Sequence, residues 1–390
     1  MRRFTPQERR ARLSRRHLLD PATHVSTVAE VADALVALHS TDPVTVYLSV
    51  RARSNGLGAD AIERELYEDR TVVRILGMRR TLFVVPRVTR PVVQAACTDA
   101  IAARERARLE AWISGTPGID DEGAWLAEAE AVTLAVVAEA GEASTAELVR
   151  TVPVLATKLE IGSGRWALEA SAGSRVLPLL AAKGELLRVR PRGTWISGQY
   201  RWTLAQTWLG EEQEMPTAPE AQATLVRSWL AAFGPGSELD LRWWTGLGAR
   251  QVRAALAAVG AVEVDLDGAT GFVLPDDLDS GDPPEPSAAL LPTLDSTTMG
   301  WKQRNWYLGP QGSLLFDSNG NAGPTVWWDG RVVGGWSQRA NGEIAYRLIE
   351  DVGSEATAAI EGEAARLAEW LGEVRFKPGF LPPFQRELAA

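Results

Sequence analysis

The chain has 390 residues, more than one ordinary hydrophobic core accommodates, so its length predicts two to four domains. Its 45% hydrophobic and 23% charged residues are typical of a soluble globular protein, and the net charge of -9 does not at first sight suggest a nucleic-acid partner. No apolar run approaches the roughly 18 residues that span a bilayer, and no apolar segment follows the basic start, so we expect no membrane span or signal peptide and a cytoplasmic protein.

The N-terminal part of the chain is basic although the whole chain is acidic. Residues 1–110 contain 19 Arg, no Lys and 13 acidic side chains, a net charge of about +6. Such a polarised distribution is typical of a surface that follows nucleic-acid phosphates. The alternative is a solvated amphipathic helix that carries the arginines on its outer face.

A first group of elements follows this basic start. Residues 26–38 have apolar side chains at helical spacing, and Asp42-Pro43 ends that helix because the residue before a proline avoids the α region. A second helix is expected from Pro43 onward and a third at 58–69. The β-branched stretch 71–86 predicts a hairpin. Two or three helices followed by a hairpin is the pattern of a winged-helix domain.

The same pattern occurs a second time. Helices are expected at 124–140, at 143–151 with Ser144 or Thr145 as the cap, and at 171–184 with an interruption at Pro178. Two strands around an Arg-Gly-containing turn follow between residues 185 and 202.

A third copy is expected between residues 218 and 275. It comprises a helix ended by Gly234, a helical pair around Gly246 and Gly248, and a hairpin that turns at Asp267-Gly268. The acidic, proline-rich stretch 275–288 is predicted to be a linker or a long loop.

The C-terminal part predicts a small antiparallel β-domain over 289–349, closed by a helix at 354–372. We therefore expect an α+β protein with four domains. Their predicted bounds are 1–115, 120–210, 216–276 and 286–390.

Several segments together resemble the AlkZ/YcaQ-type winged-helix DNA glycosylases. The resemblance spans about residues 9–350, and the segments that carry it are LHSTDP at 38–43, LYEDRTVVRILGMRRTLFVVP at 66–86, SRVLPLLAAKGELLRVRPRGTWISGQYRW at 174–202, LLPTLDSTTMGWKQR at 290–304 and NAGPTVWWDGRVVGGW at 321–336. It implies a C-shaped arc of tandem winged helices with a C-terminal β-domain. It also implies monofunctional hydrolysis of the N-glycosidic bond of alkylated purines, such as bulky N7-guanine adducts. Some members unhook crosslinks, and some give self-resistance to a DNA-alkylating natural product.

The chain departs from the family pattern at one place. The family usually has Gln-x-Gln or Gln-x-Asp where this chain has His39-Ser40-Thr41, between the matching Leu38 and Asp42-Pro43. If residue 40 is extended, side chains 39 and 41 point the same way and share one water. Neutral His39 would accept the water's proton, Thr41 would orient the water, and Asp42 would orient His39 or offset developing positive charge. The structural alternative is a helix-terminal histidine bonded to backbone, with Thr41 and Asp42 forming a turn.

Two predicted hairpins supply candidate DNA contacts, because arginines pair with phosphates and a hairpin tip enters a groove. The candidates are Arg79, Arg80, Arg188, Arg190, Arg192, Thr194, Trp195, Gln199, Tyr200 and Arg201. The alternative for the second hairpin is an ordinary solvated wing with a packed Trp195. Asp295 and Arg304 also fit the family pattern, either as a structural ion pair or as DNA contacts.

Little in the sequence points to a bound cofactor. A single cysteine, Cys97, excludes an intramolecular disulfide and a cysteine-rich zinc site. The three histidines (His17, His24 and His39) do not have the spacing of a metal triad, so we expect no metal or other cofactor. Most of the fifteen tryptophans, among them Trp166, Trp229 and Trp244, lie in apolar contexts and are expected in the core rather than in a stacking site.

Three functions remain open at this stage. The first is a monomeric DNA glycosylase acting on double-stranded DNA with an alkylated purine. The second is a non-catalytic winged-helix protein that binds damage or regulates a pathway, which the absent glutamine pair would explain. The third is a conventional transcription regulator, which usually has one winged helix rather than three.

Overall fold

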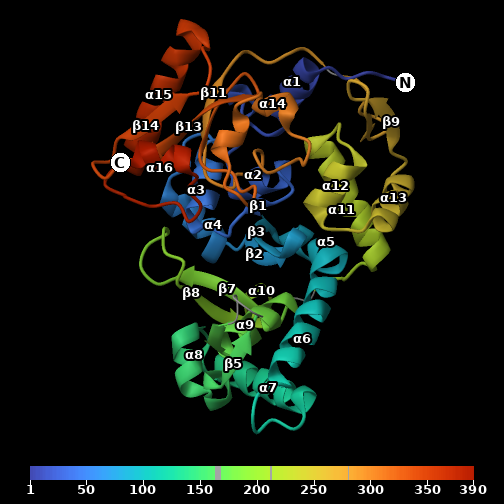
Figure 1. Ribbon diagram of the computed structural model, residues 1–390, viewed down its shortest axis with the longest axis vertical. Coiled ribbons are helices and arrows are strands. Elements are labelled where there is room, and N and C mark those ends of the chain that lie inside the picture. Colours follow the sequence, from blue (N-terminus) through green and yellow to red (C-terminus); the bar gives the residue numbers. More distant parts are fainter. Residues whose placement is uncertain (163–167, 211–212, 280) are drawn as a thin grey trace.

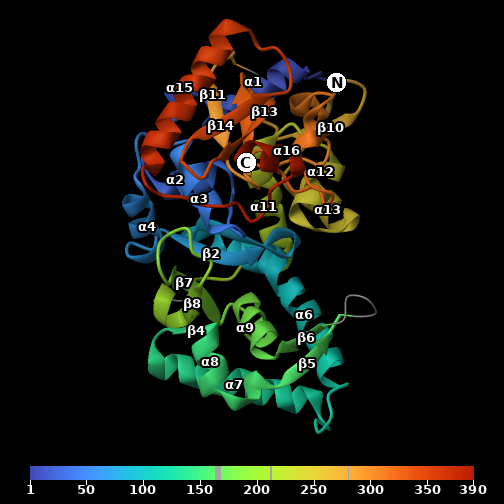
Figure 2. The same cartoon turned by 60° about the vertical axis from the view of Figure 1, so that its left-hand side comes forward.

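The computed structural model describes residues 1–162, 168–210, 213–279 and 281–390. Within these ranges α-helices alternate with five small antiparallel sheets. Figures 1 and 2 show a lower lobe formed by residues 99–162 and 168–204, which begins with helix α6 (Asp99–Ile113), while most of the remaining chain packs into an upper body. None of the described helices is long and apolar enough to cross a membrane.

The first unit of the upper body places a short strand between its helices. Its elements are α2 (Val28–Ala34), β1 (Leu38–His39), α3 (Pro43–Arg51), α4 (Ala59–Tyr67), β2 (Val72–Gly77) and β3 (Thr81–Pro86). Strand β1 pairs with β3, which gives the sheet order β1-β3-β2. The helix predicted over 26–38 is therefore wrong at its end. Residues 35–40 are all buried, which a helix with one apolar face cannot achieve, and Val36 reverses the backbone with a φ of 61°.

The second unit, in the lower lobe, has the same order of elements. They are α7 (Glu122–Ala140), β4 (Ala143–Ser144), α8 (Thr145–Thr151), α9 (Gly173–Ala182), β7 (Leu186–Pro191) and β8 (Tyr200–Leu204), with an additional pair β5 (Lys158–Ile161) and β6 (Leu168–Ser171) before α9. Ser144 and Glu147 form the predicted capping box. The interruption predicted at Pro178 is wrong. Helix α9 continues because the proline removes only the bond to the carbonyl of exposed Ser174 in the first turn.

The third unit completes the recurrence. It contains α11 (Ala218–Phe233), α12 (Glu238–Thr245), α13 (Ala249–Ala258), β9 (Val262–Asp265) and β10 (Thr270–Val273). A single bridge between Gly236 and Phe272 stands where the other units have their short strand. The predicted turn at Asp267-Gly268 is confirmed, since both residues have positive φ.

The C-terminal part forms the four-stranded sheet β11-β12-β13-β14 with helix α15 packed on it. Its elements are β11 (Ala288–Leu291), α14 (Asn305–Leu308), β12 (Thr325–Trp328), β13 (Arg331–Gln338), β14 (Ile344–Leu348), α15 (Gly353–Leu371) and α16 (Pro383–Ala389). The helix predicted to close the chain, at 354–372, is confirmed as α15. It is not the last, because α16 follows and packs against β13.

Helix α1 (Pro6–Arg16) carries many of the arginines of the basic N-terminal part. It fits neither of the two predicted roles, a surface for nucleic-acid phosphates or a solvated amphipathic helix. Arg9 and Arg12 are buried, and Arg9 stacks on Trp306 at 4.0 Å. Arg12 and Arg16 both pair with Asp277, with 2.9 Å between Arg12 Nη1 and the carboxylate. Arg12 and Arg16 therefore hold the acidic linker, and Arg9 packs on Trp306, so these three side chains do not form a phosphate-binding or solvated face.

The remaining short helices are connectors between these parts. They are α5 (Arg90–Val93), which leads through a π turn at Gln94–Thr98 into α6, and α10 (Ala205–Leu209). Trp229 and Trp244 lie in the core as predicted, with exposures of 0% and 3%. Trp166 lies outside the described residues.

Candidate active site and nucleic-acid interface

The His39-Ser40-Thr41 motif lies at the junction between β1 and α3. His39 is opposite Phe83 of β3, and the amide of Ser40 extends the pairing by donating to the carbonyl of Leu82 at 2.9 Å. Asp42 then caps α3, because its Oδ1 accepts from the amide of Val44 at 3.1 Å. The strand and the cap fix the backbone on both sides of the motif.

The His39 ring is almost fully buried, with 5% of the residue exposed. It meets the Phe83 ring edge-on at 5.4 Å, and its Nδ1 has no hydrogen-bond partner among the described residues. Burial, followed by the nearby charge of Arg79, lowers the pKa of His39 to about 3. The ring is therefore neutral at neutral pH. Such a weak base is better suited to hydrogen bonding than to taking up a proton.

The three polar residues after His39 differ in their surroundings. Ser40 is buried, and its Oγ has no partner among the described groups, while Thr41 is exposed. Asp42 is buried, and this burial raises its pKa, although hydrogen bonds from the amides of Gly379 and Val44 act in the opposite direction. The amide of Gly379 donates to Asp42 Oδ2 at 2.7 Å. No hydrogen bond joins Asp42 to His39 among the described residues, so Asp42 does not orient His39 as one of the two expected roles required.

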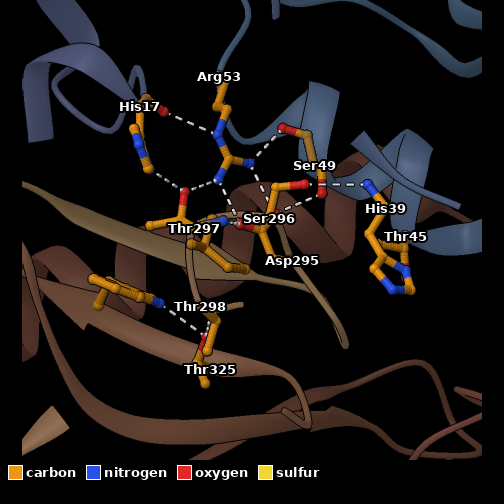
Figure 3. A network of polar contacts seen from close by, with 12 residues as sticks. His17, His39, Thr45, Ser49, Arg53, Asp295, Ser296, Thr297, Thr298 and Thr325 are labelled. Atoms are coloured by element: carbon orange, nitrogen blue, oxygen red, sulfur yellow. Dashed lines mark hydrogen bonds and ion pairs between the residues drawn. The ribbon is translucent and has the colours of Figure 1, made fainter. Parts of the chain in front are cut away.

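A buried polar network lies behind the motif (Figure 3). Arg53 and Asp295 form a bidentate ion pair at 2.6 and 3.0 Å, and both side chains are 0% exposed. Ser49 Oγ and the amide of Thr297 also donate to the carboxylate, at 2.6 and 2.9 Å. Although burial alone would raise it, the pKa of Asp295 is held below its usual value by Arg53 and these hydrogen bonds. Of the two alternatives for Asp295, the structural ion pair is thus the one found, with Arg53 rather than Arg304 as its partner.

Ser296 connects this network to the motif. Its Oγ donates to the carbonyl of Ala37 at 2.7 Å and accepts from the amide of His39 at 3.1 Å, as Figure 3 shows for His39. Thr45 of α3 likewise donates to the carbonyl of Thr293 at 2.8 Å. Segment 293–297 of the C-terminal part therefore holds β1 and α3 in position.

The connection between β7 and β8, residues 192–199, packs against the same region of the first unit. Trp195 stacks on Tyr47 of α3 at 4.7 Å, meets Trp370 edge-on at 5.8 Å, and is only 8% exposed. Gly198 lies beside Pro43, since a Cβ on this glycine would be 4.0 Å from the proline ring. The hairpin of the lower lobe thus comes next to the His39 motif, with Trp195 packed rather than free.

The remaining residues predicted for this hairpin lie mostly on the surface. Thr194 and Gln199 are exposed, whereas Tyr200 is half-buried under the guanidinium of Arg74 at 4.4 Å. Arg188 is half-buried against Trp202 at 4.5 Å, and burial, followed by the charge of Arg74, lowers its pKa to about 10.

Most of the predicted phosphate-binding arginines have carboxylate partners. Arg190 pairs with Glu68 at 2.9 Å, Arg80 with Glu105 at 2.7 Å and Arg201 with Glu142 at 3.3 Å, and Arg192 pairs with Glu147. Exposed pairs of this kind contribute about 1 kcal/mol or less. A DNA phosphate can therefore replace the carboxylate at little cost.

Arg79 differs from these arginines. It lies at the tip of the β2–β3 hairpin, where both Arg79 and Arg80 have positive φ, 54° and 62°. Its guanidinium stacks on Trp243 at 3.9 Å. Burial, followed by the charge of Arg304, lowers the pKa of Arg79 to about 10.

A known protein family matches most of the length of this chain. Residues 32–370 match the family described as DNA glycosylase AlkZ-like. This chain belongs to the AlkZ-like DNA glycosylase family. The membership inferred from the sequence motifs is therefore confirmed.

A curated sequence and a solved structure from Streptomyces sahachiroi are both similar to this AlkZ-like chain. A curated relative named interstrand DNA cross-link repair glycosylase is 28% identical over 215 residues. That match covers 53% of the chain and 57% of the relative, so the chain spans little more than half of the relative's length. The solved structure of the DNA glycosylase AlkZ has a TM-score of 0.73 at 22% identity, over 96% of this chain and 98% of that one. The two structures thus share their fold.

The candidate site has several neighbours that the sequence did not indicate. Arg53, Ser49 and His17, whose carbonyl accepts from Arg53 at 2.9 Å, had no motif of their own, and only the LDST segment around Asp295 stood out. Among the described residues there is no group of three histidine, cysteine or acidic side chains that could hold a metal ion.

Proposed function

We propose that this protein is a DNA glycosylase that hydrolyses the N-glycosidic bond of alkylated nucleotides, with bulky N7-alkylguanine as the substrate class. The observation that carries this proposal is the position of the His39 motif beside the hairpin of the lower lobe, in a chain of the AlkZ-like family. The relative named for interstrand cross-link repair supports a bulky adduct.

We also propose that the three units with the order helix, strand or bridge, helix, helix and hairpin are winged-helix modules. Together with the C-terminal sheet they would form an arc around double-stranded DNA, as a monomer. The proposed domains are those expected from the sequence, at 1–115, 120–210, 216–276 and 286–390.

The proposed chemistry makes modest demands on the protein. An alkyl group on N7 gives the purine a positive charge, so the base leaves without strong acid catalysis. Exposed Thr41 holds the attacking water, and the buried, neutral ring of His39 offers its unpartnered Nδ1 for a hydrogen bond. The carboxylate of Asp42 offsets positive charge that develops on the sugar. Positioning of this kind is worth roughly 10²–10⁴-fold in rate.

A second candidate is a damage-binding protein without catalysis. The lowered pKa of His39, about 3, favours this candidate because it makes the ring a poor general base. In this case the same surface would recognise alkylated DNA without releasing the base.

The two candidates are separated by incubating the protein with a duplex that contains one N7-alkylguanine and measuring abasic sites over time. Glycosylase activity predicts base release that falls at least tenfold in His39→Ala and in Thr41→Val. The matched controls are His24→Ala and Thr270→Val, which lie away from the motif and should keep the wild-type rate. Tight binding with no base release by the wild-type protein would reject the first candidate in favour of the second.

A further inference from the structure

Two guanidinium groups lie beside Trp243, and neither has an acidic partner among the described residues. Arg79 lies 3.9 Å and Arg304 5.2 Å from the centre of that ring, and Arg304 also lies 4.6 Å from the Phe316 ring. Both arginines are half-buried. Neither has an ion pair or a side-chain hydrogen bond to any described residue, and Arg79 Nε and Arg304 Nη1 are buried without partners.

This arrangement is electrostatically unfavourable in the free protein. Two like charges are held around one aromatic ring, and the lowered pKa of Arg79 reflects its burial first and the charge of Arg304 second. Stacking on an aromatic face offsets part of the repulsion. One buried nitrogen of each guanidinium still lacks a partner, so the geometry leaves room for an anion from outside the chain.

The backbone that presents Arg79 is strained as well. Three residues, Met78–Arg80, connect β2 to β3, and the amide of Thr81 donates to the carbonyl of Met78. Arg79 and Arg80 both have positive φ, a conformation that favours Gly or Asn rather than arginine. Strain retained at such a position often has a functional role, here that of aiming Arg79 at Trp243.

Space for a ligand adjoins Arg304. A cavity of about 590 Å³ is lined by Arg304, Asn305, Ser313, Phe316 and Asp317, among others. The carboxylate of Asp317 is the acidic group on this side, and it already accepts from the amides of Asn319 and Asn321 at 2.8 and 2.9 Å. The cavity therefore offers space for an anion beside Arg304, and the carboxylate of Asp317 in its wall is already engaged by these two amides.

The cluster also lies near the candidate active site. Arg79 is close enough for its charge to influence His39. Trp244, the neighbour of Trp243, faces the Phe83 ring at 6.4 Å, and that ring contacts His39.

We propose that Arg79, Trp243 and Arg304 form a phosphate site that holds one backbone phosphodiester of the DNA strand next to the damaged nucleotide. This inference deepens the proposed function and rests on it. Both arginines would neutralise a single phosphate beside the tryptophan, and the base attached to it would be directed toward the His39 motif.

The test measures binding of an undamaged duplex to the full-length protein by fluorescence anisotropy over a series of salt concentrations. Arg79→Gln, Arg304→Gln and the double variant are compared with wild type. Each phosphate contact contributes about 0.9 to the slope of log Kd against log salt. We expect each single variant to lower the slope by about this amount and to weaken binding several-fold. The double variant should lose little more, because both arginines hold the same phosphate.

Arg366→Gln is the matched control, since Arg366 is an exposed arginine on α15. An unchanged slope in both single variants, or an equal loss in the control, would overturn the site. Two variants on separate elements guard against a folding defect in one of them, which near-ultraviolet circular dichroism detects. Inorganic phosphate is titrated separately against the tryptophan fluorescence. If the variants weaken the binding of inorganic phosphate but leave duplex binding unchanged, the site takes free phosphate and the proposal fails.

Base release from the alkylated duplex is measured in parallel. If the wild-type protein releases no base but the variants have a lower salt slope, the phosphate site is supported and the proposed glycosylase function is rejected. If the wild-type protein releases the base but Arg304→Gln binds the duplex normally, the glycosylase function is supported and the phosphate site is rejected.

Discussion

Replacing Asp295 by Asn tests the role of the buried network behind the candidate site. The change keeps the side chain's shape but leaves Arg53 as an uncompensated charge, and both residues are 0% exposed. Breaking a buried pair in this way costs about 3–5 kcal/mol. For an upper body of this size, we expect the unfolding temperature to fall by roughly 6–10 °C.

The double variant Arg53→Met/Asp295→Leu sharpens this prediction. Replacing both charges with apolar groups of similar volume is often neutral, so most of the lost stability should return. The exposed pair of Arg347 with Glu387 is the control, and Arg347→Gln should cost less than about 1 kcal/mol.

Unfolding is followed by tryptophan fluorescence during thermal and urea denaturation. Asp295→Asn should also slow base release, because the adjacent Ser296 bonds to the backbone of His39 and Ala37. A loss no larger than that of the surface control, or a double variant as unstable as the single one, would refute the reasoning.

Three further predictions concern single features of the site. The pKa of His39 is about 3 in the folded chain and about 6.5 unfolded, so the unfolded chain binds a proton that the folded chain does not between these pH values. The free energy of unfolding therefore falls as pH drops through this window, by up to about 1.4 kcal/mol per pH unit. Urea denaturation at several pH values should give a smaller dependence of this free energy on pH in His39→Gln than in the wild type. The same pH dependence in both proteins would contradict a buried neutral ring. Trp195→Ala removes a packed ring and should cost up to about 3–5 kcal/mol, seen as faster hydrogen exchange across 192–199; protection equal to wild type would show that the ring does not hold the connection. Arg79→Asn with Arg80→Gly relieves two positive-φ positions and should raise stability by about 1–2 kcal/mol while weakening duplex binding; a loss of stability would show that the turn is not strained.

The repeated units were largely predictable because their signals are local. Caps such as Ser144 with Glu147, and a turn such as Asp267-Gly268, lie within a few residues of the elements that they define. Strand β1 was missed because the apolar run Leu35–Leu38 fits a buried helix end as well as a strand.

The interior of the site was not predictable for a different reason. Arg53 and Asp295 are 242 residues apart, so no spacing along the chain links them. The same holds for Arg79, Trp243 and Arg304, which come from three separate parts of the sequence. The sequence singles out the His39 motif as a candidate site, but whether each of its side chains is exposed depends on these distant partners.

The long separations around the motif determine when it can form during protein synthesis. His39 bonds to Ser296, 257 residues later, and Asp42 bonds to Gly379, 337 residues later. At about 5–20 residues per second, a ribosome needs roughly 20–70 s to make the chain between Asp42 and Gly379. The lower lobe packs its own apolar core from residues 109–202 and can fold during that interval. The nascent chain therefore has a folded hairpin to place beside the motif before the motif itself is complete.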